Sequence, residues 1–102
     1  MPTAQGFIKG CYMDFTSTFI IDDIQYHFSG RLSPPVPEFE CPEATLKYES
    51  LEALTDERLF DGKIGSSDVN LEVKPGVRIT GRLDLPISPA HRVSGEAEWS
   101  SN

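Results

Sequence analysis

The fold is decided by the stretch Phe28-Ser29-Gly30-Arg31-Leu32, in which a lone glycine takes an apolar position of an alternating pattern. Side chains alternate between the two faces of a strand, so this glycine points toward the core with its apolar neighbours. An isolated glycine in a strand marks a bend in the sheet or the close approach of another backbone. The same phrase recurs at Ile8-Lys9-Gly10-Cys11-Tyr12, Phe60-Asp61-Gly62-Lys63-Ile64, Ile79-Thr80-Gly81-Arg82-Leu83 and Val93-Ser94-Gly95-Glu96-Ala97. The repetition predicts a small, strongly curved antiparallel sheet or a closed barrel.

Apolar and polar residues alternate around these glycines, which is the pattern of half-buried strands. The alternation is clearest over residues 24–32, 77–85 and 93–99, and a first strand is predicted over residues 5–15, with Phe7, Cys11, Met13 and Phe15 facing the core. Asp22-Asp23 and Lys74-Pro75-Gly76 each lie between two such runs and predict hairpin turns, since Asp tolerates the backbone angles of a two-residue loop.

Prolines and one short segment interrupt the alternation. Pro34, Pro35 and Pro37 are expected to end a strand, because proline supplies no ladder donor, and a loop is expected up to Pro42. Residues 50–59 predict a short helix at most. Together these segments predict one all-β domain over residues 1–102, an antiparallel β-barrel or tightly coiled β-sandwich of seven to eight strands with at most one short helix.

Two segments half a chain apart resemble each other. Residues 27–36 are HFSGRLSPPV and residues 78–87 are RITGRLDLPI, so that Gly, Arg and Leu align and a proline and a branched aliphatic follow. A duplication and convergence on one way of ending a strand both explain this likeness. In either case the two segments are expected to occupy equivalent positions in the sheet.

Negative charge is concentrated in the middle of the chain. The net charge is −7, and residues 38–72 hold ten of the acidic residues but only three of the basic ones. An acidic chain is unsuited to binding nucleic acid or an anionic membrane surface. The segment 38–61 therefore predicts a docking surface for a partner protein with a basic patch, the alternative being a solvated face that keeps the protein soluble. The candidate residues are Glu38, Glu40, Glu43, Glu49, Glu52, Asp56 and Glu57.

Four basic or titratable residues form a second candidate group. His27, Arg31, Arg78 and Arg82 lie on the polar faces of the predicted strands and could contact an anion or a partner carboxylate. The alternative is that they form cross-strand ion pairs with Glu72, Asp84, Glu96 or Glu98.

No motif for catalysis, a cofactor or a metal is present in the sequence. The isolated glycines do not form a phosphate loop, and the two cysteines and two histidines lack the short spacing of a zinc site. Cys11 and Cys41 are expected to be free thiols in the cytoplasm, although a single disulfide between them is the alternative.

The sequence therefore predicts a non-enzymatic protein-interaction module that uses the acidic surface or an exposed sheet edge. The alternative function is a small barrel that binds an apolar or aromatic ligand in its interior. An open sheet would expose edges that pair, so a homodimer is a further expectation.

Overall fold

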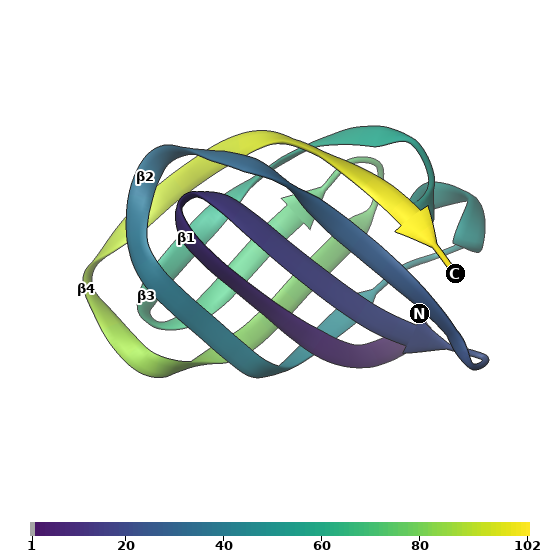
Figure 1. Ribbon diagram of the computed structural model, residues 1–102, viewed down its shortest axis with the longest axis horizontal. Helices are drawn as coiled ribbons and strands as arrows, with labels where there is room; N and C mark the ends of the chain where they lie inside the picture. The colour runs from purple at the N-terminus through teal and green to yellow at the C-terminus, as the bar shows by residue number, and fades with distance from the viewer. Residues whose placement is uncertain (1) are drawn as a thin grey trace.

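Within residues 2–102, four long strands form the sheet. A computed structural model describes residues 2–102, with β1 at Thr3–Ile21, β2 at Ile24–Lys47, β3 at Glu57–Val73 and β4 at Val77–Ser101. They form one antiparallel sheet in the order β1-β2-β4-β3 (Figure 1). The prediction of an all-β antiparallel domain is confirmed. The sheet has four long strands rather than seven to eight short ones, and its ladder does not close into a barrel.

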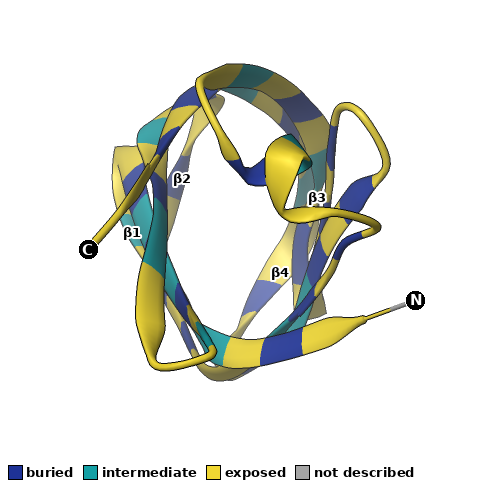
Figure 2. Ribbon diagram, turned by 90° about the vertical axis from the view of Figure 1, so that its right-hand side faces the viewer, coloured by how far each residue is buried: buried dark blue, intermediate teal, exposed yellow. Residues whose placement is uncertain are grey.

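Each central strand bends near its middle, so that the sheet wraps around its own core (Figures 1 and 2). The ladder between β2 and β4 breaks between Ser33 and Ala44 on β2, and between Gly81 and Ser94 on β4. The prolines lie inside these breaks: Pro34, Pro35, Pro37 and Pro42 in β2, and Pro86 and Pro89 in β4. The prediction that the prolines end the strands was wrong, because a missing donor costs little where no partner strand needs it.

The two hairpins, β1–β2 and β3–β4, are built alike. Three cross-strand pairs of the first hairpin, Phe15↔Gly30, Asp14↔Arg31 and Tyr12↔Val36, correspond in place to Val69↔Gly81, Asp68↔Arg82 and Ser66↔Ile87 of the second. The central ladder follows the same relation, since Gly30 pairs with Ala97 and Gly81 pairs with Ala44. The expectation that residues 27–36 and 78–87 are equivalent in the sheet is therefore confirmed.

The phrase glycines lie in strands and permit close backbone contacts, as predicted. Gly62 lies between buried Phe60 and Ile64, and a Cβ added there would collide with the backbone carbonyl of Asn70, in the other half of the same strand. The bent β3 thus brings its two halves into contact at a position where only glycine fits.

Aromatic rings fill the interior. The ring centroid of Phe15 lies 5.8 Å from that of Phe28 and 5.2 Å from that of Phe60, and Phe28 lies 6.1 Å from Phe60. Trp99 stacks on Phe28 with 4.5 Å between centroids. All four side chains are at most 4% exposed.

The alternation predicted for the first strand fails at its bend. Tyr12 has a φ of 58°, and the register with β2 shifts on both sides of it. Each bulge changes which face the following residues occupy, so Phe15 is buried as predicted while Cys11 and Met13 are exposed. Cys41, expected in a loop, is instead a buried residue of β2.

The connections between the strands are short. Asp22 and Asp23 both have positive φ, 51° and 65°, which confirms the predicted two-residue hairpin. The helix predicted over residues 50–59 is reduced to a 3₁₀ turn, η1 (Leu51–Leu54), because β3 begins at Glu57. This turn lies across one end of the wrapped sheet (Figure 2).

Candidate functional site

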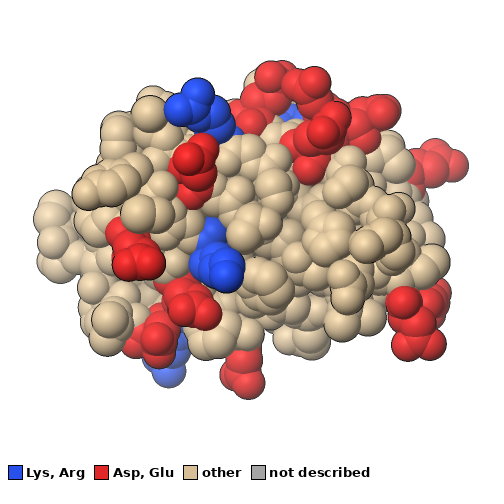
Figure 3. All heavy atoms as spheres, viewed as in Figure 1, with Lys and Arg blue, Asp and Glu red and all other residues tan. Residues whose placement is uncertain are grey.

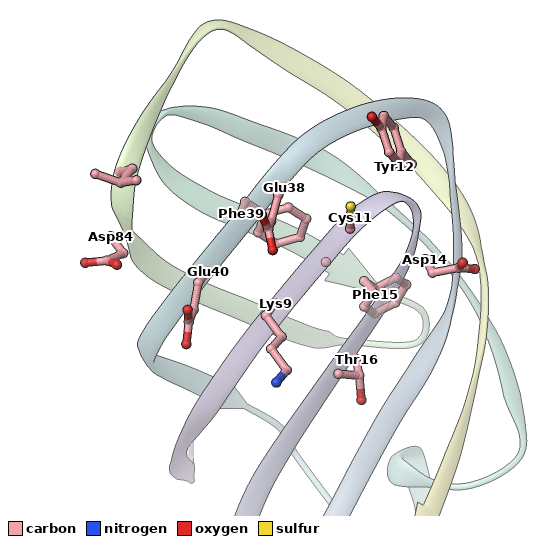
Figure 4. Close-up of a pocket in the computed structure, with 12 residues that line it drawn as sticks. Lys9, Cys11, Tyr12, Asp14, Phe15, Thr16, Glu38, Phe39, Glu40 and Asp84 are labelled. Carbon is pink, nitrogen blue, oxygen red and sulfur yellow. The ribbon is translucent and has the colours of Figure 1, made fainter.

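An open groove of about 820 Å³ lies where β1 and β2 bend, and we call it the acidic groove. Its walls come from both halves of β1, from β2 around Phe39 and from the bend of β4 at Asp84 and Leu85 (Figure 4). The groove therefore exists only because the strands are bent, since a flat sheet would separate these segments. Its lining residues are Lys9, Gly10, Cys11, Tyr12, Asp14, Phe15, Thr16, Glu38, Phe39, Glu40, Asp84 and Leu85.

Carboxylates dominate the rim of the acidic groove. Glu38 and Glu40 lie on β2, Asp84 stands apart on β4 and Asp14 on the far side of β1 (Figure 4). Asp14 pairs with Arg31, with 3.6 Å between Oδ1 and Nε. Within residues 2–102 the other three carboxylates have no basic partner within 4.0 Å. In Figure 3, which has the view of Figure 1, acidic side chains surround a basic one on the left half of the molecule, where the strands bend.

One basic residue lines the acidic groove without neutralising it. Lys9 is the cross-strand partner of Glu40, yet its Nζ lies over the ring of Phe7, 5.8 Å from the centroid. A cation over an aromatic face is attracted by the ring, which draws the ammonium group toward Phe7. The groove therefore keeps an excess of negative charge.

Exposed apolar groups lie beside these carboxylates. Tyr12 is 67% exposed and Leu85 is 75% exposed, whereas Phe15 and Phe39 are buried. The left-handed backbone of Tyr12 costs a non-glycine residue roughly 1–2 kcal/mol. Because its ring is exposed, no packing in the core offsets this conformational cost. Strained residues of this kind concentrate at functional sites.

The structure separates the acidic residues predicted to form one surface. Glu38 and Glu40 line the acidic groove, and Glu43 follows on β2. Glu49, Glu52 and Asp56 lie in or beside η1, while Glu57 begins β3 opposite Glu98. Sequence reasoning missed Asp14, Asp84, Tyr12 and Leu85 as residues of this groove. No local signal marks these four residues, because only the bends bring them together.

The predicted basic group is also divided. His27 hydrogen-bonds through Nδ1 to Thr18 Oγ1 and through Nε2 to Asn102 Oδ1, at 2.8 Å each. Arg31 faces Asp14, and Arg82 is the cross-strand partner of Asp68. Arg78 Nη2 donates to Glu72 Oε1 at 2.7 Å, which is one of the ion pairs expected as the alternative. The first half of β2 pairs with the second half of β4, so these four residues do not meet in one site.

In comparisons with known proteins, no family model matches this sequence, and no curated protein or solved structure matches it. Residues 2–102 contain no helix with the length and apolar character needed to cross a membrane. In the same residues, no three His, Cys, Asp or Glu side chains are grouped to hold a metal ion.

The two cysteines are free thiols with opposite surroundings. Cys11 is exposed in the acidic groove, whereas Cys41 is fully buried. Burial, and secondly the negative charge of Asp68, raise the pKa of the Cys41 thiol from 9.0 to about 11. The thiolate is the reactive form of cysteine, so Cys41 is both shielded and protonated at neutral pH.

We expect a thiol-reactive dye to modify Cys11 rapidly and Cys41 only after unfolding. At pH 7 the folded protein should consume one equivalent of dye, and a second equivalent should react when denaturant is added. The Cys11→Ser variant should show no fast phase. Because the pKa of Cys41 is raised in the folded state, the protonated thiol contributes to the free energy of unfolding below pH 9. This contribution is lost as the pH rises through about 11. Rapid labelling of Cys41 in the folded Cys11→Ser variant would contradict this assignment.

Proposed function

We propose that this protein is a non-enzymatic protein-interaction module, and that its acidic groove docks a basic segment of a partner protein. The observation that carries the proposal is a groove that holds Glu38, Glu40 and Asp84, which have no basic partner among residues 2–102, together with an exposed Tyr12 in a costly backbone conformation. Carboxylates without partners favour cations, and complementary charge across an interface increases the rate and specificity of association.

The proposed partner combines positive charge with apolar side chains. Lysine or arginine residues would pair with the carboxylates, while neighbouring apolar residues would cover Tyr12 and Leu85. An extended segment with alternating basic and apolar residues meets both requirements, since its side chains point to opposite sides. Excess negative charge in the groove disfavours nucleic acid and anionic lipid as occupants.

We expect the neutral double variant Glu38→Gln/Glu40→Gln to bind a basic peptide about tenfold more weakly than the original protein. Two exposed ion pairs, each worth up to about 1 kcal/mol, correspond to that loss. The probe is a short fluorescein-labelled peptide of alternating lysine and valine, and its binding is followed by fluorescence anisotropy. Raising the salt concentration to about 0.5 M should weaken binding to the original protein, because screening shortens the reach of the charges.

Two further variants control this experiment. Glu57→Gln/Glu98→Gln removes the same charge from another pair of strands and should leave peptide affinity unchanged. Tyr12→Gly removes the exposed ring and relieves the left-handed backbone, so it should weaken binding without lowering the free energy of unfolding. Equal affinity in all of these variants, or binding that ignores salt, would contradict the proposal.

The alternative function, an apolar ligand held inside the sheet, has weaker support because the four-ring cluster of Phe15, Phe28, Phe60 and Trp99 occupies the interior.

For the fold, we propose that the bent sheet acts as a barrel of eight half-strands. The close contact at Gly62 supports this description, as does the hydrogen bond at 3.0 Å from Lys74 N, one residue beyond the end of β3, to Leu59 O near its start. The free thiols support a cytoplasmic location.

A further inference from the structure

A second hollow, of about 590 Å³, lies at the bend of β3 and β4, and we call it the Lys63–Arg92 hollow. Lys63 and Arg92 are direct cross-strand partners, and both are exposed. Ser33 and Ser94, which are also cross-strand partners, and Asn70 line the same hollow. Two cations, two hydroxyls and an amide therefore line one space, together with two carboxylates, Asp61 and Glu72.

The pairing of Lys63 with Arg92 is electrostatically unfavourable, because both side chains are positively charged. Like charges directly opposite each other on neighbouring strands destabilise a sheet. Within residues 2–102, no carboxylate lies within 4.0 Å of either cation. Two acidic residues also line the hollow: Glu72 is bound to Arg78 at 2.7 Å, and among residues 2–102 Asp61 has no basic partner within 4.0 Å. An anion between the two cations would remove the repulsion.

The hollows at the bends of the two hairpins differ in the side chains that line them. Lys63 pairs across the strands with a second cation, Arg92, whereas Lys9 in the acidic groove pairs with Glu40, where the charges are opposite. Ser33 and Pro34 stand where the acidic groove has Asp84 and Leu85. One hollow thus presents mainly carboxylates and exposed apolar groups, whereas the other presents two cations, two carboxylates and two hydroxyls.

We propose that the Lys63–Arg92 hollow binds a phosphate-type oxyanion. The ammonium and guanidinium groups would neutralise its charge, and guanidinium matches phosphate oxygens with two parallel hydrogen bonds. The hydroxyls of Ser33 and Ser94 and the Asn70 amide supply further donors. This site is separate from the acidic groove, so it does not depend on the function proposed above.

The test is a titration of the full chain with sodium phosphate at constant ionic strength, followed by amide chemical shifts. We expect saturable shifts confined to residues around Ser33, Lys63, Asn70 and Arg92. Lys63→Gln and Arg92→Gln should each weaken binding about fivefold or more. Lys63→Gln should also unfold at a higher temperature than the original protein in the absence of phosphate, because it removes the like-charge pair.

Lys9→Gln is the matched control, since Lys9 is an exposed lysine that lines the acidic groove of the other hairpin, and it should bind phosphate as the original protein does. A parallel titration with phosphoserine identifies the source of the group, because tighter binding than inorganic phosphate indicates a phosphorylated molecule. The proposal is overturned if shifts rise linearly without saturation, if they spread over all basic residues, or if Lys9→Gln weakens binding as much as Lys63→Gln.

Discussion

Replacing Gly30 by alanine should lower the free energy of unfolding by about 2–3 kcal/mol, whereas Gly81→Ala should cost less than about 1 kcal/mol. The two glycines are equivalent in the fold, but a Cβ at Gly30 would lie 2.6 Å from Ala97 Cα and 2.6 Å from the carbonyl oxygen of Glu96. The corresponding distances at Gly81 are 3.2 Å to Ala44 Cα and 3.2 Å to Glu43 O. The backbone must move in the first case, while a small adjustment suffices in the second.

Denaturant titrations of both variants, followed by the fluorescence of Trp99, measure this difference. An alanine in a strand recovers roughly 0.5–1 kcal/mol of the entropy that glycine loses on folding, which offsets part of the cost at Gly81. Equal destabilisation of the two variants would show that the closer approach of β2 to β4 at Gly30 does not affect the free energy of unfolding.

Phe28→Ala is expected to be the most damaging single substitution, with a loss of about 3–5 kcal/mol of unfolding free energy. Phe28 is fully buried and contacts the rings of Phe15, Phe60 and Trp99. Removing its ring leaves a cavity at the centre of this cluster. Because Trp99 stacks on Phe28, the emission spectrum of the folded variant should also shift.

Leu85→Ala provides the contrast to Phe28→Ala, because Leu85 is 75% exposed and lines the acidic groove. Its unfolding free energy should stay within about 0.5 kcal/mol of the original, while the affinity for the lysine–valine peptide falls. A large loss of stability in Leu85→Ala would mean that this side chain packs in the folded protein and is not available to a partner.

Local patterns in the sequence were sufficient to predict much of the sheet. The alternation around Gly30 and Gly81 identified the central strands, and the likeness of residues 27–36 and 78–87 anticipated their equivalent positions. Asp22-Asp23 identified the first hairpin. These features depend on neighbours in the chain, on which side-chain alternation and turn chemistry act directly.

The strand bends could not be predicted in the same way. A proline in a continuous strand and a proline in a loop have the same local signature, and only the partner strand decides between them. At Pro34 and Pro35 that partner, β4, has already turned away. The positive φ of Tyr12 shifted the alternation of β1, so Cys11 was assigned to the wrong face.

The candidate site shows the same limit. Glu38 and Glu40 were predicted as part of a longer acidic segment, but the sequence could not indicate which acids share a groove. Asp84 joins them from β4, which lies far away in the chain, because the bends of both strands line the same groove. The charge composition of the sequence therefore predicted that the candidate site is acidic. Which residues line it depends on the bends of the strands in the folded protein.

The ladder between β2 and β4 also has a kinetic consequence. Each hairpin closes through contacts between adjacent strands, whereas in the described part of the chain β2–β4 is the only ladder that joins one hairpin to the other. Contacts that close short loops form before those that close long ones. Assembly should therefore begin in two local nuclei, and the docking of one preformed half onto the other should limit the folding rate.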